Sequence, residues 1–471
     1  MDKLEQLFLS FTGLEPESVE ELSAAGSRRR YYRIRAGKTT LIGVHGTDMD
    51  ENRAFFSIAS HLRSKGIAVP EVKAVSEDGM FYIQEDLGDE LLYSRLEASR
   101  RAGLYGPEER RLLCRAMAEL PRIQFEGGDG MDFSVCYPAP SFNGRMVDFD
   151  LNYFKYCFLK PSSVEFNEER LQDDFERLKA DLLGCGGEVF MYRDFQARNI
   201  MLKDGGLWFI DFQGGRRGPF YYDVASFVWQ ARACYPPELR RLLVDTYFDS
   251  LQKYCIVDRG VFDSTLRRFV LFRTLQVLGA YGFRGRIEKR AHFLESIPYA
   301  LANLRELLCE PFGEYPYLCE VLKGLASTVP APSAQEAGTL EVHVLSFSYR
   351  KGIPEDYSGN GGGYVFDCRS VHNPGKYERY RHSTGLDDDV RRFLEEDGEI
   401  TVFLSHIIPL VDAHVDRFVE RGFTHLQIAF GCTGGQHRSA YSAQAVATHL
   451  ASRKGVKVHL THRELGIDTY L

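Results

Sequence analysis

Apolar and polar residues alternate, or recur at helical spacing, along most of this chain, and the pattern changes in a definite order. Residues 31–35 and 40–45 are rich in β-forming side chains on either side of an Ala-Gly-Lys turn, which predicts a β-hairpin. Residues 52–66 carry apolar side chains at helical spacing and end at a glycine, which predicts a helix. Residues 80–90 read as a strand that runs into a polar turn. This part of the chain therefore predicts a small sheet with a helix.

Helical spacing dominates the segment that follows. It covers residues 107–125, 167–183 and most of 224–322. Two apolar strands interrupt it, at residues 189–202 and 206–215, and each runs into a polar loop. A small lobe of strands followed by a larger helical lobe is the order of elements in a two-lobed kinase.

Strand and helix patterns alternate in the last part of the chain, which is typical of a parallel α/β sheet. The pattern predicts strands at residues 339–352, 361–371 and 456–465, a strand leading into a helix at 399–422, and a strand, glycine loop and helix at 425–455. The predicted fold class is thus α/β and α+β in two domains. A bilobal, kinase-like domain comes first, and a small α/β domain with a mostly parallel sheet follows.

A change of composition separates the two predicted domains. Residues 324–339 are rich in Pro, Ala and Ser and lack aromatic residues, which is typical of an interdomain linker. The first domain is therefore expected at residues 1–323 and the second at 340–471. Within the first domain, the small lobe is expected at about residues 1–88 and the large lobe at about 89–323.

Composition narrows the kind of protein. With 471 residues, 44% hydrophobic and 26% charged, the chain has material for more than one globular core. A net charge of −8 gives no general attraction to nucleic acid. No segment reads as a membrane span, and the first apolar run is too short for a secretory signal. Ten scattered cysteines without a C-x-x-C pair favour reduced thiols, so we expect a cytoplasmic protein without a membrane partner.

Three polar residues follow the two strands of the large lobe in a pattern that suits phosphoryl transfer. Asp194 and Asn199 lie five residues apart in YRDFQARN, and Asp211 follows in IDFQ. One carboxylate would accept a proton from the attacking hydroxyl, and the other carboxylate with the amide would hold Mg²⁺ on the phosphates. Two such motifs, each after an apolar strand, favour a kinase. The plain alternative is that these residues only cap turns.

These motifs, with GPFYYDVAS at residues 218–226, resemble the aminoglycoside-phosphotransferase-type kinases over about residues 22–304. Within that group they look most like the cell-wall-recycling kinases that phosphorylate the anomeric hydroxyl of N-acetylmuramate or N-acetylglucosamine. The resemblance implies ATP and Mg²⁺ as cofactors and an amino sugar as acceptor. It makes Asp194, with Arg193 beside it, the catalytic base, and Asn199 and Asp211 the metal ligands. The implied nucleotide contacts are a phosphate loop and the hinge backbone: Gly26, Ser27, Arg28, Arg29, Arg30, Glu85, Asp86 and Leu87.

The kinase-like half also departs from the usual pattern. Tyr192 stands two residues before the base in place of the usual His, and Gln196 stands where protein kinases place a phosphate-binding Lys. The strand TTLIGVHG has no central Lys, so the arginines at 28–30 would supply the charge, unless they form a solvated face. The missing Lys motivates a second hypothesis, a non-catalytic nucleotide or phosphosugar sensor or an RNA-binding adaptor. The resemblance makes Asp223 a structural acid that braces the catalytic loop.

The segment FGCTGGQHRSA at residues 430–440 places a glycine loop between a buried strand and a helix. The helix N-terminus and the loop amides favour an anion, and Arg438 adds a planar fork for phosphate oxygens. The spacing from Cys432 to Arg438 is also that of a cysteine phosphatase, a third hypothesis that requires a thiolate and a general acid. No W-P-D loop or obvious substitute for it occurs in this half. A glycine turn with a surface arginine is the plain alternative.

Five ordered motifs, LSFSYRKGIP, YVFDCRSVHNP, TGLDDDV, GCTGGQHRS and THREL, resemble the C-terminal domain of the bacterial RNase adapter protein RapZ over residues 340–471. The resemblance implies binding of glucosamine-6-phosphate, a part in oligomerisation and small-RNA binding, although the near-neutral charge of this half counts against an RNA partner. The implied phosphosugar-binding residues are Cys432, Thr433, Gly434, Gly435, His437, Arg438 and Ser439. His372 and His462 are further implied contacts. Zinc at His459 and His462 is disfavoured, because three residues along a strand put them on opposite faces.

Together the two halves predict an ATP-dependent sugar kinase joined to a domain that senses a phosphosugar and regulates the kinase. A homo-oligomer that forms through the second domain is implied by the same resemblance.

Overall fold

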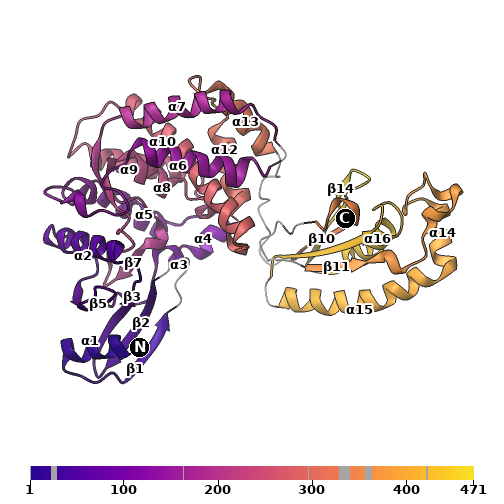
Figure 1. Ribbon diagram of the computed structural model, residues 1–471, viewed down its shortest axis with the longest axis horizontal. Helices are drawn as coiled ribbons and strands as arrows, with labels where there is room; N and C mark the ends of the chain where they lie inside the picture. The colour runs from indigo at the N-terminus through magenta and orange to yellow at the C-terminus, as the bar shows by residue number, and fades with distance from the viewer. Residues whose placement is uncertain are drawn as a thin grey trace. The chain divides into compact units, whose positions relative to one another are not determined.

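The computed structural model describes residues 2–22, 29–162, 164–294, 296–327, 340–354, 356, 363–420 and 423–471. The chain forms two compact units, Met1–Ala280 with Pro298–Ala331, and Tyr281–Ile297 with Pro332–Leu471. Figure 1 traces the chain through both units.

A five-stranded antiparallel sheet with the order β1-β2-β3-β5-β4 forms the small lobe. Its strands are β1 (Ser18–Leu22), β2 (Arg30–Ala36), β3 (Thr39–His45), β4 (Val72–Val75) and β5 (Phe81–Glu85). Helix α1 (Asp2–Thr12) packs Leu4 and Phe8 against one face of this sheet. Helix α2 (Met49–Ser64) begins after Asp48, whose carboxylate accepts the first N–H groups of the helix. The predicted hairpin and helix are confirmed.

The large lobe is mainly helical (Figure 1). Its helices and those that follow are α3 (Leu92–Arg95), α4 (Glu97–Ala102), α5 (Pro107–Phe125), α6 (Gly144–Phe154), α7 (Glu168–Gly184), α8 (Tyr221–Val228), α9 (Pro237–Leu251), α10 (Arg259–Tyr281), α11 (Ala291–Leu294), α12 (Ile297–Leu307) and α13 (Pro316–Ser327). Two short antiparallel pairs join β6 (Glu188–Met191) to β9 (Arg216–Pro219), and β7 (Ile200–Lys203) to β8 (Gly206–Phe209). The loops after β6 and β8 carry the predicted catalytic motifs.

Helix α13 extends past the predicted start of the linker. Gly324 to Ser327 belong to its last turn, where Leu325 and Ala326 are buried. The expected linker start at residue 324 is therefore wrong by four residues, because Leu325 continues the buried stripe of Leu318 and Leu322. Residues 328–339 lie outside the described ranges.

The second unit contains a five-stranded sheet with the order β11-β12-β10-β13-β14. Its elements are β10 (Leu340–Ser348), β11 (Gly363–Asp367), α14 (Asp388–Asp397), α15 (Glu399–Glu420), β12 (His425–Cys432), α16 (Arg438–Ala451), β13 (Val456–His462) and β14 (Ile467–Tyr470). The first four strands in the order are parallel, and β14 is antiparallel to β13. One hydrophobic core joins β10, β12 and β13 to all three helices. The predicted fold class is confirmed.

Two predictions in this unit need correction. Residues 399–406 are the first turns of α15 and not a strand, because Ile400, Leu404 and Ile407 recur at helical spacing and bury one helix face. Strand β14 was not predicted, since all four of its residues are exposed and lack an apolar face.

Two features concern the chain as a whole. All ten cysteines are free thiols. Among the described residues, no helix combines the length and the apolar character that crossing a membrane requires.

Candidate functional site

The loop after β6 is fixed by a buried carboxylate. Asp223 on α8 accepts the backbone N–H groups of Tyr192 (2.9 Å) and Arg193 (2.8 Å) and the side-chain amide of Gln124 (2.9 Å). Burial raises the pKa of Asp223 to about 6, against the lowering effect of these three donors. The geometry gives Asp223 the bracing role that the resemblance implied.

Two residues in the site have left-handed backbone conformations without being glycine. Arg193 has φ 77° and Asp211 has φ 64°. Such conformations are unfavourable for ordinary residues and persist only where the surroundings hold them. The hydrogen bond from the Arg193 N–H to Asp223 stabilises this conformation at Arg193. Asp194 follows directly, after the chain has left β6.

Asp194, Asn199 and Asp211 come together as predicted. The Asn199 amide donates to the Asp194 carbonyl oxygen (2.8 Å) and to Asp211 Oδ2 (3.2 Å). Burial, and then the charge of Asp194, raise the pKa of Asp211. Two neighbouring carboxylates create a place where a cation is stabilised.

The residues present fit a magnesium ion. Carboxylate and amide oxygens are hard ligands, and Mg²⁺ commonly takes only one or two carboxylates, with water and phosphate oxygens completing the shell. Asp211 and the Asn199 amide oxygen would hold it. Among the described residues, no three His, Cys, Asp or Glu side chains are grouped to hold a metal by themselves.

The predicted hinge residues are fastened by their side chains. Glu85 contacts Lys203 at 2.8 Å, and Asp86 pairs with Arg33 at 2.7 Å. The Lys203 ammonium also donates to the Asp86 carbonyl oxygen. Leu87 is buried. The contact of this backbone with adenine stays a prediction, and the ion pairs hold its position.

The predicted phosphate loop is only partly described. Gly26, Ser27 and Arg28 lie outside the described residues. Arg29 is 5% exposed. Arg30 is exposed and forms two hydrogen bonds with Glu21, each 2.9 Å. Arg29 and Arg30, which look alike in the sequence, thus differ in environment.

Two residues near Asp211 were missed from the sequence: Gln213, which contacts Asp211, and Glu51, which contacts Gln213. Gln213 donates to Asp211 Oδ1 at 2.9 Å and lies 3.4 Å from the carboxylate of Glu51, on α2. Gln213 follows the motif IDF directly, and this position next to Asp211 is a sequence signal for a residue of the site. Glu51 carries no such signal, since it lies far away in sequence.

The glycine loop of the second unit begins at Cys432, the last residue of β12. Its Sγ accepts the N–H of Gly435 (3.2 Å) and lies 3.1 Å from the Ser439 hydroxyl. Cys432 is 3% exposed. Thr433 and Gly434 are exposed. The loop therefore turns tightly around the sulfur, and α16 begins directly after it.

Arg438 and His437 are directed to a neighbouring segment. Arg438 is 4% exposed and donates to the carbonyl oxygens of Arg369 and Val371, the latter at 2.8 Å. Its Nε is buried without a partner among the described residues. His437 Nε2 lies 2.9 Å from the Tyr380 carbonyl oxygen. The guanidinium thus fastens the turn after β11, and phosphate binding by Arg438 stays a prediction.

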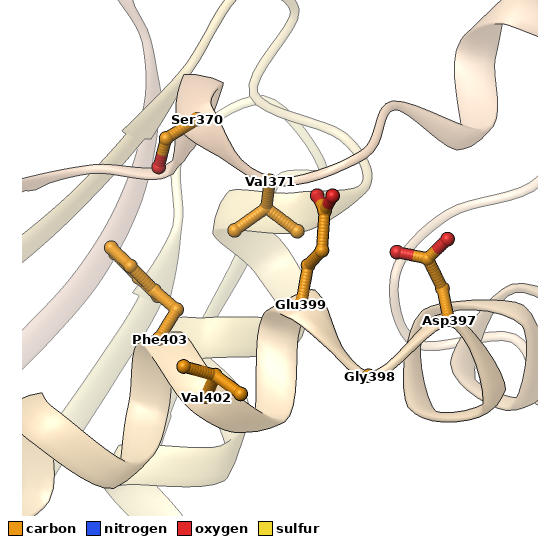
Figure 2. Close-up of a pocket in the computed structure, with 7 residues that line it drawn as sticks. All are labelled: Ser370, Val371, Asp397, Gly398, Glu399, Val402 and Phe403. Carbon is orange, nitrogen blue, oxygen red and sulfur yellow. The ribbon is translucent and has the colours of Figure 1, made fainter.

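A cavity of about 560 Å³ lies near this turn, between Val371 and the start of α15 (Figure 2). Asp397 and Glu399 contribute carboxylates to its wall. His372 contacts both, with its ring nitrogen 2.7 Å from Asp397 and its backbone N–H 2.7 Å from Glu399. An acidic wall repels phosphate, so the glycine loop is the better anion site of this unit.

His459 and His462 lie on opposite faces of β13, as strand alternation predicts. His459 contacts Asp468 at 2.5 Å and stacks on His343, whereas His462 contacts the buried Ser346 at 2.9 Å.

The glycine loop offers a test with a matched pair of substitutions. Gly435 has φ 73°, and a Cβ there would lie 2.3 Å from Glu464 Cγ and 2.9 Å from the Ser348 amide nitrogen. A Cβ added at Gly434 would have no neighbouring heavy atom within 4 Å. We expect Gly435→Ala to destabilise the second unit by about 1–3 kcal/mol and Gly434→Ala to have little effect. Hydrogen exchange of residues 425–451 in the full chain measures this, and equal exchange in both variants would contradict the strained turn.

A family model described as Phosphotransferase enzyme family matches residues 18–256. The chain belongs to this phosphotransferase family. A second model, the RapZ C-terminal domain, matches residues 340–466. Both resemblances that the motifs carried are thus confirmed at family level.

Curated relatives match a limited part of the chain. A nucleotide-binding protein of Endomicrobium trichonymphae is 36% identical over 126 residues, which are 27% of this chain and 42% of the relative. One of Halorhodospira halophila is 41% identical over 133 residues, 28% of this chain and 44% of the relative. The chain spans about two fifths of the length of these curated relatives.

Solved structures of two kinases are similar to most of this phosphotransferase chain. Choline kinase LicA from Streptococcus pneumoniae is 14% identical, with 69% of this chain and 99% of that chain covered and a TM-score of 0.42. Aminoglycoside phosphotransferase APH(4)-Ia is 14% identical, with 66% of this chain and 99% of that chain covered and a TM-score of 0.44.

Proposed function

We propose that this phosphotransferase uses ATP to phosphorylate a sugar hydroxyl, and that the anomeric hydroxyl of N-acetylmuramate or N-acetylglucosamine is its target. The convergence of Asp194, Asn199 and Asp211 carries the proposal. These residues place a base, an amide and a second carboxylate at the ends of β6 and β8, and family membership supports the same chemistry.

Each residue has a stated role in this mechanism. Asp194 accepts the proton of the sugar hydroxyl as its oxygen attacks the γ-phosphorus, and the bond to the β-phosphate oxygen breaks to release ADP. Arg193, through its fixed backbone, aims Asp194 at that hydroxyl. Asp211 and Asn199 would hold Mg²⁺, which supplies positive charge to the phosphate oxygens when bound.

The second unit is proposed to bind a phosphosugar at the loop from Cys432 to Ser439. The tight turn and the helix that follows provide backbone N–H groups for an anion, and the match to the RapZ C-terminal domain supports this assignment. A cysteine phosphatase is less favoured, because the Arg438 guanidinium contacts carbonyl oxygens of the turn after β11.

A panel of amino sugars tests the kinase proposal. The purified full chain, with ATP and Mg²⁺, is expected to phosphorylate at least one of N-acetylmuramate, N-acetylglucosamine, glucosamine and galactosamine. NMR of the product identifies the hydroxyl, and a reaction with GTP tests the nucleotide. Binding of ATP without transfer of its γ-phosphoryl group to any of these sugars would instead support a sensor or an RNA-binding adaptor.

A further inference from the structure

The small lobe lacks a lysine where kinases place their phosphate-binding cation. Strand β3 reads TTLIGVH, and its central positions Ile42 and Val44 are buried and apolar. A nucleotide triphosphate needs a desolvated positive charge close to the metal ligands. The residues around Asp211 show which side chain provides it.

Arg29 lies directly beside this site. Its guanidinium is buried, lies 3.5 Å from the Glu51 carboxylate, and stands over the ring of Phe55 at 5.6 Å. Phe55 in turn stacks on Phe212, the residue after Asp211, with ring centroids 5.3 Å apart.

Glu51 connects Arg29 to the metal-ligand loop. Its Oε1 faces Arg29 and also lies 3.4 Å from Gln213 Nε2, which donates to Asp211 Oδ1 at 2.9 Å. A chain of polar contacts therefore runs from the small lobe through α2 to Asp211 in the large lobe. This chain of contacts fixes the Arg29 guanidinium relative to the Asp211 carboxylate.

Arg30 does not compete for this role. Its side chain is 59% exposed and is held by Glu21, whose carboxylate is 2.9 Å away on the neighbouring strand β1. A solvated cation paired on an edge strand contributes little to a phosphate site. Arg35 on β2, whose exposed side chain pairs with Glu20 at 3.2 Å, serves as the matched control for Arg29.

The geometry points to Arg29 as the cation that binds the β- and γ-phosphates of the nucleotide, with Glu51 as its positioning residue. This inference rests on the proposed ATP-dependent function. Arginine suits the position because its planar guanidinium presents several donors to phosphate oxygens while one edge contacts Glu51. Protein kinases pair a lysine on the strand that corresponds to β3 with a glutamate on the following helix. In this chain the Arg29–Glu51 pair would take the place of that pair.

Nucleotide binding to the full chain tests the role of Arg29 without a sugar. Calorimetry with ATP and AMP separates phosphate contacts from adenine contacts. We expect Arg29→Met to weaken ATP binding about 10- to 100-fold and to change AMP binding less than threefold. Arg29→Lys should recover most of the ATP affinity, and Arg35→Met should bind both nucleotides as the unaltered chain does.

The outcomes separate this inference from the function on which it rests. If the unaltered chain does not bind ATP, the proposed function fails. If it binds ATP and Arg29→Met binds ATP equally well, or loses ATP and AMP affinity equally, the role of Arg29 is wrong.

A double-mutant cycle tests Glu51. Glu51→Gln should weaken ATP binding when Arg29 is present and have no further effect beside Arg29→Met, because its influence passes through the guanidinium. Additive losses would show that Glu51 acts on ATP binding independently of Arg29 and would overturn its positioning role.

Discussion

Asp194→Asn is expected to lower kcat for sugar phosphorylation by about 10²- to 10⁴-fold, the usual contribution of a general base. The substitution keeps the size of the side chain and removes the proton acceptor. The backbone contact that Asn199 makes with the Asp194 carbonyl oxygen persists, so the loop keeps its shape. ATP affinity should change little, because the ligands Asn199 and Asp211 remain.

Asp204→Asn is the matched control for this prediction. Asp204 lies in the exposed turn between β7 and β8 and has φ 51°, a conformation that asparagine also adopts. Initial rates at saturating sugar and ATP measure the effect. A kcat within threefold of the unaltered chain for Asp194→Asn would show that another group accepts the proton.

The catalytic motifs could be predicted because their geometry is local. Asp194 and Asn199 are separated by one loop and a single helical turn, so their spacing alone brings them together. Asp211 follows β8, and Asn199 precedes β7. The two strands are antiparallel, so the start of β7 lies beside the end of β8 and Ile200 pairs with Phe209. These three residues needed no knowledge of distant parts of the chain.

Glu51 and Gln213 could not be paired from the sequence. Their contact depends on how α2 packs over the large lobe through Phe55 and Phe212, and no spacing rule connects such distant residues. The same limit applies to Arg29. Arg29 and Arg30 look equivalent in sequence, and only the burial and the partner of each side chain distinguish them.

Residues 399–406 show another reason for error, and Arg438 has contacts that its motif does not indicate. The first turns of α15 combine β-branched and aromatic residues that favour a strand, but burial of Ile400 and Leu404 on one face selects a helix. The motif around Arg438 predicts an anion contact, whereas the side chain is occupied by carbonyl oxygens from the turn after β11. Tertiary packing decides both cases.

Asp223→Asn is expected to lower kcat by about 10²-fold, the cost of a small misplacement of catalytic groups. The carboxylate accepts three donors, from Tyr192, Arg193 and Gln124. Asparagine has one acceptor oxygen, and its NH₂ group would face an N–H donor. The left-handed conformation of Arg193 then loses its support, and Asp194 loses its orientation.

The same substitution should also change how stability depends on pH. Because the folded-state pKa of Asp223 is raised to about 6, its proton stabilises the fold below the unfolded pKa of 3.8. That stabilisation, on the order of 3 kcal/mol for a shift of about two pKa units, is lost as pH rises through 6. Asp223→Asn removes this pH dependence. The difference in unfolding free energy between the unaltered chain and the variant should therefore shrink between pH 4 and pH 7.

Chemical denaturation followed by tryptophan fluorescence measures this change, because both tryptophans, Trp208 and Trp229, lie in the first unit. Asp173→Asn, an exposed acid on α7, is the control and should leave kcat and the pH slope unaltered. If Asp223→Asn kept full activity, the loop would hold its strained backbone without the carboxylate, and the conformation of Arg193 would have to come from the packing of Tyr192 alone.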